Sequence, residues 1–361
     1  MVKRIGILTG GGDAPGLNAV IRAAVKTAIN DYGCEAFGIR NGYDGFLEAD
    51  GIIPLGMDEV RGILPRGGTI LGSANRGNPY ARKVIRDGQE VTIDVSDEIV
   101  AGIKKLRMDA LLVLGGDGTL HIAHELFIKG VPVIGVPKTI DNDIGGTEIT
   151  FGFDTALNIA TEALDRLHTT AESHHRVMVI ELMGRDAGFI ALNAGVSGGA
   201  DVILIPEIPF KFESVVAKVR ERANKGSKFS LFAVSEGAKP KGGSQVFSRK
   251  GDEIYVPRLG GVGQVVAEYV EKQGFESRVT VLGHLQRGGT PTAFDRWLAT
   301  RYGAAAVRLA VRGGFDRMVA LSCGRITDLP LEEALAVPKR VKLDDDAVIT
   351  ARSVGISFGD E

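Results

Sequence analysis

The sequence predicts an α/β protein of two Rossmann-like three-layer α/β/α units with largely parallel sheets. Apolar runs of strand length alternate with longer helical patterns along most of the 361 residues. Clusters of glycine and charge follow many of the apolar runs, as loops at strand ends do. In open α/β sheets ligands bind beyond the carboxyl ends of the strands. We therefore expect the functional residues in these loops.

Expected strands and helices alternate along the first half of the chain. The boundary between the two units is expected near residues 140–155. Pro15 is expected in the first turn of its helix and Ser96 as an N-cap. The expected strands are 4–8, 36–39, 110–114 and 131–136, and the expected helices are 14–29, 95–106 and 120–129.

The second half repeats the alternation. Residues 237–255 are polar and rich in glycine, which predicts a loop or a hairpin, and the tail from Pro338 is mixed. The expected strands are 177–182, 201–205, 230–234 and 278–282, and the expected helices are 155–170, 189–196, 215–224, 260–272 and 295–312.

Composition excludes several classes of protein. The formal net charge is −2, so no general basic field favours nucleic acid. No apolar run approaches the ~18 residues of a membrane-spanning helix, and the apolar part of residues 5–8 is too short for a signal peptide. Cys34 and Cys323 are expected to be reduced thiols, with the cytoplasm as the compartment. A membrane or nucleic-acid partner is not expected.

The first glycine-rich loop, residues 9–16, joins the first strand to the first helix. Gly11 and Gly12 would let backbone N–H groups approach a phosphate at the helix N-terminus. Many ordinary strand–helix turns also carry two glycines. The segment matches neither the Walker pattern nor the dinucleotide fingerprint, which argues against a common P-loop enzyme or dehydrogenase.

The second glycine-rich loop reads Gly115-Gly116-Asp117-Gly118-Thr119. It could be a tight turn whose Asp caps the next helix. The functional interpretation is that Asp117 holds Mg²⁺, which takes few carboxylates and shares oxygens with substrate phosphates. Gly118 would then leave room for the phosphates of the donor.

The third loop, residues 137–143, contains Lys138, Thr139, Asp141 and Asp143 directly after an apolar run. These residues could be a solvated surface turn. Two carboxylates and a lysine after a buried strand instead favour a site for phosphoryl transfer. An Asp at a strand end can take the proton of an attacking hydroxyl, and a cation can stabilise developing charge.

Four arginines near strand ends favour an acidic substrate, because guanidinium groups bind phosphates in a forked geometry. They are Arg176, Arg185, Arg278 and Arg287. The histidines lack the ligand spacing of a structural zinc site, and neither serine–glycine segment shows a nucleophile–base–orienter set.

The segments TGGGDAPGLN (9–18), GGDGT (115–119), PKTIDNDI (137–144), MGRDAG (183–188) and LGHLQRGGTP (282–291) together resemble 6-phosphofructokinase. Their order and spacing match along nearly the whole chain. The resemblance implies the phosphofructokinase fold and phosphoryl transfer to the C1 hydroxyl of fructose 6-phosphate in glycolysis, with Mg²⁺. It also implies a homo-oligomer, usually a tetramer.

By resemblance Asp141 is the catalytic base, Thr139 contacts the transferring phosphoryl group, and Asp117 is the magnesium ligand. Arg176 and Arg278 would reach the sugar phosphate of a neighbouring subunit, so that assembly completes each active site. The expected catalytic residues are Asp141, Thr139 and Arg185. The expected donor-binding residues are Gly11, Gly12, Gly116, Gly118 and Thr119. The expected sugar-phosphate residues are Thr139, Asp141, Arg176, Met183, Gly184, Arg185, Glu236, Arg278, His284 and Arg287.

Two positions bear on the phosphoryl donor. ATP users of this family have glycine where Gly118 stands, and pyrophosphate users typically have aspartate there. Common bacterial ATP users have glycine where Lys138 stands, and pyrophosphate users have lysine. Gly118 controls access, so we expect ATP as the donor, with the reversible pyrophosphate enzyme as the alternative. The resemblance weakens at Asn75 and Arg76, which leaves the adenine contacts open.

The resemblance also implies a division of labour. A donor domain would take about residues 1–150 and 286–336, and a fructose 6-phosphate domain about 151–285 and 337–361. A non-catalytic sugar-phosphate sensor on this fold is a third hypothesis. A base and a metal ligand, the roles that the resemblance gives Asp141 and Asp117, argue against a sensor, which needs neither.

Overall fold

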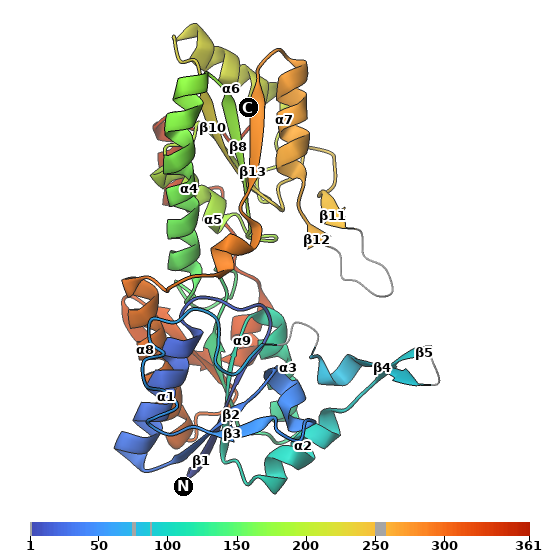
Figure 1. Ribbon diagram of the computed structural model, residues 1–361, viewed down its shortest axis with the longest axis vertical. Coiled ribbons are helices and arrows are strands. Elements are labelled where there is room, and N and C mark those ends of the chain that lie inside the picture. The colour runs from blue at the N-terminus through green and yellow to red at the C-terminus, as the bar shows by residue number, and fades with distance from the viewer. Residues whose placement is uncertain (1, 74–76, 87–88, 250–257) are drawn as a thin grey trace. The chain divides into compact units, whose positions relative to one another are not determined.

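A computed structural model describes residues 2–73, 77–86, 89–249 and 258–361. The chain divides into two compact units. Unit 1 comprises Met1–Asp154 and Arg287–Pro338, and unit 2 comprises Thr155–Gln286 and Lys339–Glu361 (Figure 1). Asn75 and Arg76, where the family resemblance weakens, lie outside the described residues.

Unit 1 contains a seven-stranded sheet in the order β15-β14-β7-β6-β1-β2-β3. The five inner strands are parallel, and the edge strands β15 and β3 pair antiparallel with their neighbours. The strands are β1 (Arg4–Thr9), β2 (Glu35–Ile39), β3 (Ile52–Pro54), β6 (Ala110–Gly115), β7 (Val133–Pro137), β14 (Arg317–Ser322) and β15 (Arg325–Pro330). The edge strands β3 and β15 and the inner strand β14 were not expected from the sequence.

Helices cover both faces of this sheet. Successive side chains of a strand point to opposite faces, so Ile5 and Ile7 of β1 join one apolar cluster and Leu8 joins the other. The first cluster includes α1 (Leu17–Tyr32) and α8 (Ala293–Val311), which pack together (Figure 1). The second includes α2 (Ser96–Lys105), α3 (Asp117–Ile128) and α9 (Leu331–Ala336).

A small excursion interrupts unit 1 between β3 and α2. It holds the 3₁₀ turn Pro79–Ala81 and a hairpin of β4 (Arg82–Arg86) and β5 (Gln89–Ile93), and another 3₁₀ turn, Gly42–Phe46, precedes β3. The hairpin projects away from the rest of unit 1 (Figure 1). Its largely exposed residues carry no clean apolar alternation, which is why the sequence did not predict it.

Unit 2 contains a four-stranded sheet in the order β13-β8-β10-β9, and every pair is parallel. Helices α6 and α7 cover one face, and α5 packs on the other with α10 beside it. The strands are β8 (Val177–Leu182), β9 (Val202–Leu204), β10 (Ser230–Ser235) and β13 (Ser277–Val281). The helices are α4 (Phe153–His174), α5 (Phe189–Ser197), α6 (Phe212–Asn224), α7 (Val262–Lys272) and α10 (Asp346–Ser353).

The polar segment 237–255 is in part a hairpin, as predicted. Its described portion contains β11 (Phe247–Arg249), which pairs antiparallel with β12 (Arg258–Leu259). Residues 250–255 of the predicted segment lie outside the described residues.

Two helix starts differ from the sequence prediction. Pro15 precedes α1 instead of lying in its first turn, because Gly16 is the N-cap with a φ of 106° that only glycine adopts readily. Ser96 is not the N-cap of α2 either. Its amide and hydroxyl both donate to Asp94 Oδ1, at 2.8 and 2.6 Å, so the Asp94 side chain organises this start.

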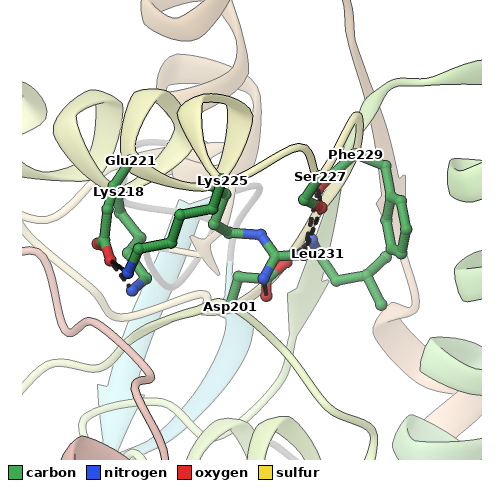
Figure 2. Close-up of polar contacts among 8 residues, drawn as sticks. Asp201, Lys218, Glu221, Lys225, Ser227, Phe229 and Leu231 are labelled. Atoms are coloured by element: carbon green, nitrogen blue, oxygen red, sulfur yellow. Dashed lines mark hydrogen bonds and ion pairs between the residues drawn. The ribbon is translucent and has the colours of Figure 1, made fainter.

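A partly buried ionic contact ties α6 to the sheet of unit 2. Figure 2 shows Asp201 below the end of the helix, where its Oδ1 lies 2.6 Å from Arg222 Nη1 and its Oδ2 accepts from the Leu231 amide at 2.9 Å. Burial raises the pKa of Asp201, and the Leu231 amide and the Arg222 guanidinium only partly offset this rise. This cluster fixes the starts of β9 and β10.

Candidate active site

The loop after β1 lies against the loops that follow β6 and β7. The Gly10 amide donates to Leu114 O at 2.9 Å, and the Lys138 ammonium donates to Gly12 O. A Cβ at Gly12 would lie 2.8 Å from Nη1 of Arg287. The absence of a side chain at Gly12 therefore leaves room for the Arg287 guanidinium, which lies against the glycine loop of unit 1.

The loop after β6 forms the N-terminus of α3, which begins three residues earlier than predicted. Gly116 is the N-cap, and no side chain caps the helix, so the alternative of a capping Asp117 is wrong. Backbone N–H groups at a helix start attract anions. Half of the Asp117 side chain is exposed. The backbone carbonyl oxygen of Asp117 lies 3.0 Å from His121 Nδ1.

Glycines of this loop differ in what surrounds them. A Cβ at Gly115 would lie 2.4 Å from the Cβ of Thr119, so packing requires glycine there. A Cβ at Gly118 would meet nothing within 4 Å, and the residue lies in ordinary helical backbone. Neither packing nor backbone geometry explains glycine at position 118. Its missing side chain instead leaves space at the helix start.

The loop after β7 buries three side chains that were predicted to be functional. Lys138, Thr139 and Asp141 are 3, 6 and 4% exposed. The Thr139 hydroxyl accepts from the Asp141 amide at 3.0 Å, and the Thr150 hydroxyl donates to Thr139 O at 2.7 Å. Asn142 adopts a φ of 55°, and its Oδ1 accepts from the Thr150 amide at 3.1 Å. Residues 139–142 are therefore a fixed turn.

Asp141 Oδ1 is buried and has no hydrogen-bond partner among the described residues. An unsatisfied buried carboxylate oxygen is costly and is unusual in a folded protein. Such an atom is free to accept the proton of a ligand hydroxyl.

The metal prediction depends on Asp117 alone. Within the described ranges, no group of three or more His, Cys, Asp or Glu side chains could hold a metal ion. One carboxylate still fits Mg²⁺, because this ion keeps several water or phosphate ligands.

In unit 2 five of the predicted sugar-phosphate residues follow the carboxyl ends of β8, β10 and β13, namely Met183, Gly184, Arg185, Glu236 and His284. The Arg185 amide donates to Glu236 Oε1 at 3.2 Å. Gly184 has a φ of 143°, and a Cβ there would lie 2.5 Å from Ala187 O, so glycine is required. The side chains of Arg185 and His284 are exposed. The Arg185 guanidinium and the His284 imidazole are thus exposed on one tightly folded set of loops.

Gln286 belongs to this set, although sequence analysis gave it no role. Its Oε1 accepts from the Met183 amide at 2.8 Å, and its side chain is fully buried. A glutamine within a glycine-rich loop is all that the sequence shows of it, because its burial and its hydrogen bond appear only in the structure.

The structure does not bring Arg176 and Arg278 together with Arg185. Arg176 precedes β8 and Arg278 lies near the start of β13, at the amino ends of these strands. The six residues of β8 span about 20 Å. Both arginines form ion pairs with Glu276, at 2.8 and 2.7 Å. A single copy of unit 2 therefore cannot direct all three arginines to one phosphate.

Comparison with known proteins agrees with this architecture. The sequence profile of the phosphofructokinase family, described as Phosphofructokinase, matches residues 4–310. The ATP-dependent 6-phosphofructokinase of Chloroflexus aurantiacus is 54% identical over 360 residues, which are 99% of this chain and 98% of that protein. A pyrophosphate–fructose 6-phosphate 1-phosphotransferase of Streptomyces coelicolor is 51% identical over 359 residues, 99% of this chain and 100% of that protein.

Among solved structures, the phosphofructokinase of Pichia pastoris in the T-state is 31% identical with a TM-score of 0.81. The match covers 93% of this chain and 36% of the Pichia chain, so the present chain spans about a third of that length. The predicted fold class and the resemblance are confirmed. This chain belongs to the phosphofructokinase family.

Proposed function

We propose that this protein transfers the γ-phosphoryl group of ATP to the C1 hydroxyl of fructose 6-phosphate, which yields fructose 1,6-bisphosphate and ADP. The observation that carries the proposal is Asp141, a buried carboxylate with an unpartnered oxygen in a fixed turn. Relatives named ATP-dependent 6-phosphofructokinase, at 50–54% identity, support the same activity.

In the proposed reaction Asp141 accepts the proton of the attacking hydroxyl. The oxygen that loses this proton forms the new bond to phosphorus, and the bond to the ADP oxygen breaks. Thr139 accepts from the Asp141 amide through its oxygen, so its O–H is free to donate to the transferring group. The Arg185 guanidinium is exposed and would neutralise charge on the substrate.

Mg²⁺ would bind at Asp117, and when bound it would neutralise charge on the donor phosphates. The half-exposed carboxylate at the start of α3 supports this role. The same helix start offers backbone N–H groups to the donor, together with Gly11, Gly12, Gly116 and Thr119.

ATP is the proposed donor because the space at Gly118 is open. Since the protein itself does not require glycine there, its presence fits a requirement of the ligand. Within the proposal, unit 1 binds the donor and unit 2 binds the sugar phosphate, through loops at the carboxyl ends of their strands.

A pyrophosphate-dependent reaction is the second candidate. Lys138 has the residue type typical of pyrophosphate users, and a relative at 51% identity carries the corresponding name. The Lys138 ammonium is buried against Gly12 O, where it would assist either donor. Fructose 6-phosphate phosphorylation should be measured with ATP and with pyrophosphate at matched concentrations. ATP turnover with little or none from pyrophosphate is expected, and a preference for pyrophosphate would overturn the donor assignment.

Shared active sites in a homo-oligomer, a tetramer by family resemblance, belong to the same proposal. Arg176 and Arg278 lie at the opposite strand ends from Arg185, which supports a role toward a neighbouring copy. Mixing Asp141→Ser subunits with Arg278→Ala subunits should restore activity through hybrid sites that carry neither change. Activity that stays at the level of the separate variants, once mass spectrometry demonstrates subunit exchange, would refute shared sites.

A cytoplasmic location completes the proposal. None of the helices in the described ranges has the length and apolar character of a membrane span. Cys34 and Cys323 are free thiols, which suits a reducing compartment. A sugar-phosphate sensor is disfavoured, because it would not need the buried Asp141 carboxylate beside Thr139.

A further inference from the structure

The turn at residues 283–287 contains one side chain that does not face solvent. Gln286 is 0% exposed, whereas its neighbour Leu285 is 67% exposed and His284 is also exposed. Glutamine is seldom fully buried unless it makes hydrogen bonds. We therefore expect the Gln286 side chain to make hydrogen bonds inside the protein.

One such bond joins Gln286 Oε1 and the Met183 amide, at 2.8 Å. The donor must be an N–H, so the partner atom on Gln286 is its carbonyl oxygen. Met183 is the first residue after β8 and leads directly into Gly184 and Arg185. The bond thus links the turn that carries His284 to the segment that carries Arg185.

The same segment is strained and tightly packed. Gly184 and Arg185 have φ angles of 143° and 52°, both in the left-handed half of backbone space. A Cβ at Gly237 would lie 1.9 Å from Arg185 O, so the loops touch backbone to backbone. A conformation of this kind persists only when its surroundings hold it. Glu236 binds the Arg185 amide, and Gln286 binds the Met183 amide.

Two further polar atoms beside this segment lack partners among the described residues, namely Gln286 Nε2 and Ser235 Oγ. Ser235 is also 0% exposed, and its Oγ lies 3.6 Å from the Cβ position of Gly184. The two residues thus differ in one respect that matters. Gln286 makes a bond to the Met183–Arg185 backbone, and the Ser235 hydroxyl makes none.

We infer that Gln286 is a positioning residue, which through its carbonyl oxygen fixes the Met183–Arg185 backbone relative to His284 for binding of the sugar phosphate. The inference rests on the proposed function for the identity of the ligand. The effect of Gln286 on the backbone is independent of the proposed function, because it can be measured without any ligand.

The first test measures amide hydrogen exchange of the full-length protein in the peptide that contains Met183. Gln286→Met has nearly the same shape but no acceptor, so exchange at Met183 should accelerate at least tenfold. Gln286→Glu keeps an acceptor oxygen, and burial favours its neutral acid form, so exchange should accelerate less than in Gln286→Met. Unchanged exchange in Gln286→Met, or equal acceleration in both variants, would overturn the inference.

The second test measures equilibrium binding of fructose 6-phosphate without a donor, together with the KM for each substrate. Gln286→Met should weaken fructose 6-phosphate binding about tenfold, the scale of leaving one buried N–H unsatisfied, with the KM for ATP changed less than twofold. A residue that matters only for stability would lower the melting temperature without this selective loss.

Ser235→Ala is the matched control. It removes, from the same set of loops, a buried hydroxyl that has no hydrogen-bond partner among the described residues. Its exchange at Met183 and its fructose 6-phosphate affinity should stay within about twofold of the wild type. Equal losses in Ser235→Ala and Gln286→Met would show a general effect of packing and overturn the inference. If wild-type protein does not bind fructose 6-phosphate, the proposed function fails, and the exchange comparison still decides the role of Gln286.

Discussion

The loops that follow β6 and β7 are neighbours in one sheet, yet they differ in their exposure. In the first loop Asp117 and Gly118 are exposed at the start of a helix. In the second loop Lys138, Thr139 and Asp141 are all less than 7% exposed. The Lys138 amide donates to Gly115 O at 3.0 Å, so the two loops are held side by side.

This difference indicates a division of roles. An exposed helix start with an open position can accept a large charged donor and discriminate by what fits. A buried carboxylate in a fixed turn lies where charge interactions are less screened, which suits proton transfer. Substitutions in the buried loop should therefore affect the chemical step, and substitutions in the exposed loop should affect the choice of donor.

The largest effect is expected from Asp141→Asn in the buried loop. The amide keeps the shape of the side chain but cannot accept the hydroxyl proton as a base. We expect kcat to fall by ~10²–10⁴-fold, with fructose 6-phosphate binding largely retained. Steady-state kinetics and equilibrium binding check both parts. A folded variant with near-normal kcat would remove Asp141 from the role of base.

The next largest effect is expected from Gly118→Asp in the exposed loop. The position is open, so the protein should fold, and the new carboxylate would lie beside donor phosphates. Like charges about 4 Å apart cost about 4 kcal/mol at an effective dielectric near 20, so ATP turnover should fall by roughly a hundred- to a thousandfold.

Pyrophosphate lacks an α-phosphate and a nucleoside, so its use by Gly118→Asp should suffer less than the use of ATP. Gly118→Ala is the matched control, since it adds a methyl group without charge and should keep most ATP activity. Full ATP activity in Gly118→Asp would contradict the assignment of Gly118 to donor access.

The smallest effects concern stability and compare two glycines of the same loop. Gly115→Ala would force its Cβ against Thr119 and should destabilise unit 1 by about 1–3 kcal/mol. Gly118→Ala lies in an exposed helical position with free space and should stabilise by about 0.5–1 kcal/mol. Denaturation midpoints of the two variants should shift in opposite directions. Shifts of the same sign would refute the distinction between a packed and an open glycine.

Sequence periodicity predicted the inner parallel strands and their helices because these segments bury apolar residues at regular intervals. Arg4–Thr9, Ala110–Gly115 and Val177–Leu182 are strands within a residue or two of their predicted ends. The hairpin β4–β5 and the edge strands β3 and β15 escaped prediction, because exposed or half-exposed edges carry little apolar pattern.

The order of motifs along the chain determined the family, and with it the glycines, carboxylates and arginines that make up the candidate site. Only the tertiary structure decided that Gly118 is open while Gly115 is packed, and that Asp141 is buried with an unpartnered oxygen. It alone also showed Gln286 bound to Met183, and Arg176 and Arg278 at the strand ends opposite Arg185. The physical reason is that residue type fixes which chemistry is possible, whereas burial, free space and hydrogen-bond partners depend on segments that are distant in sequence and meet only in the fold.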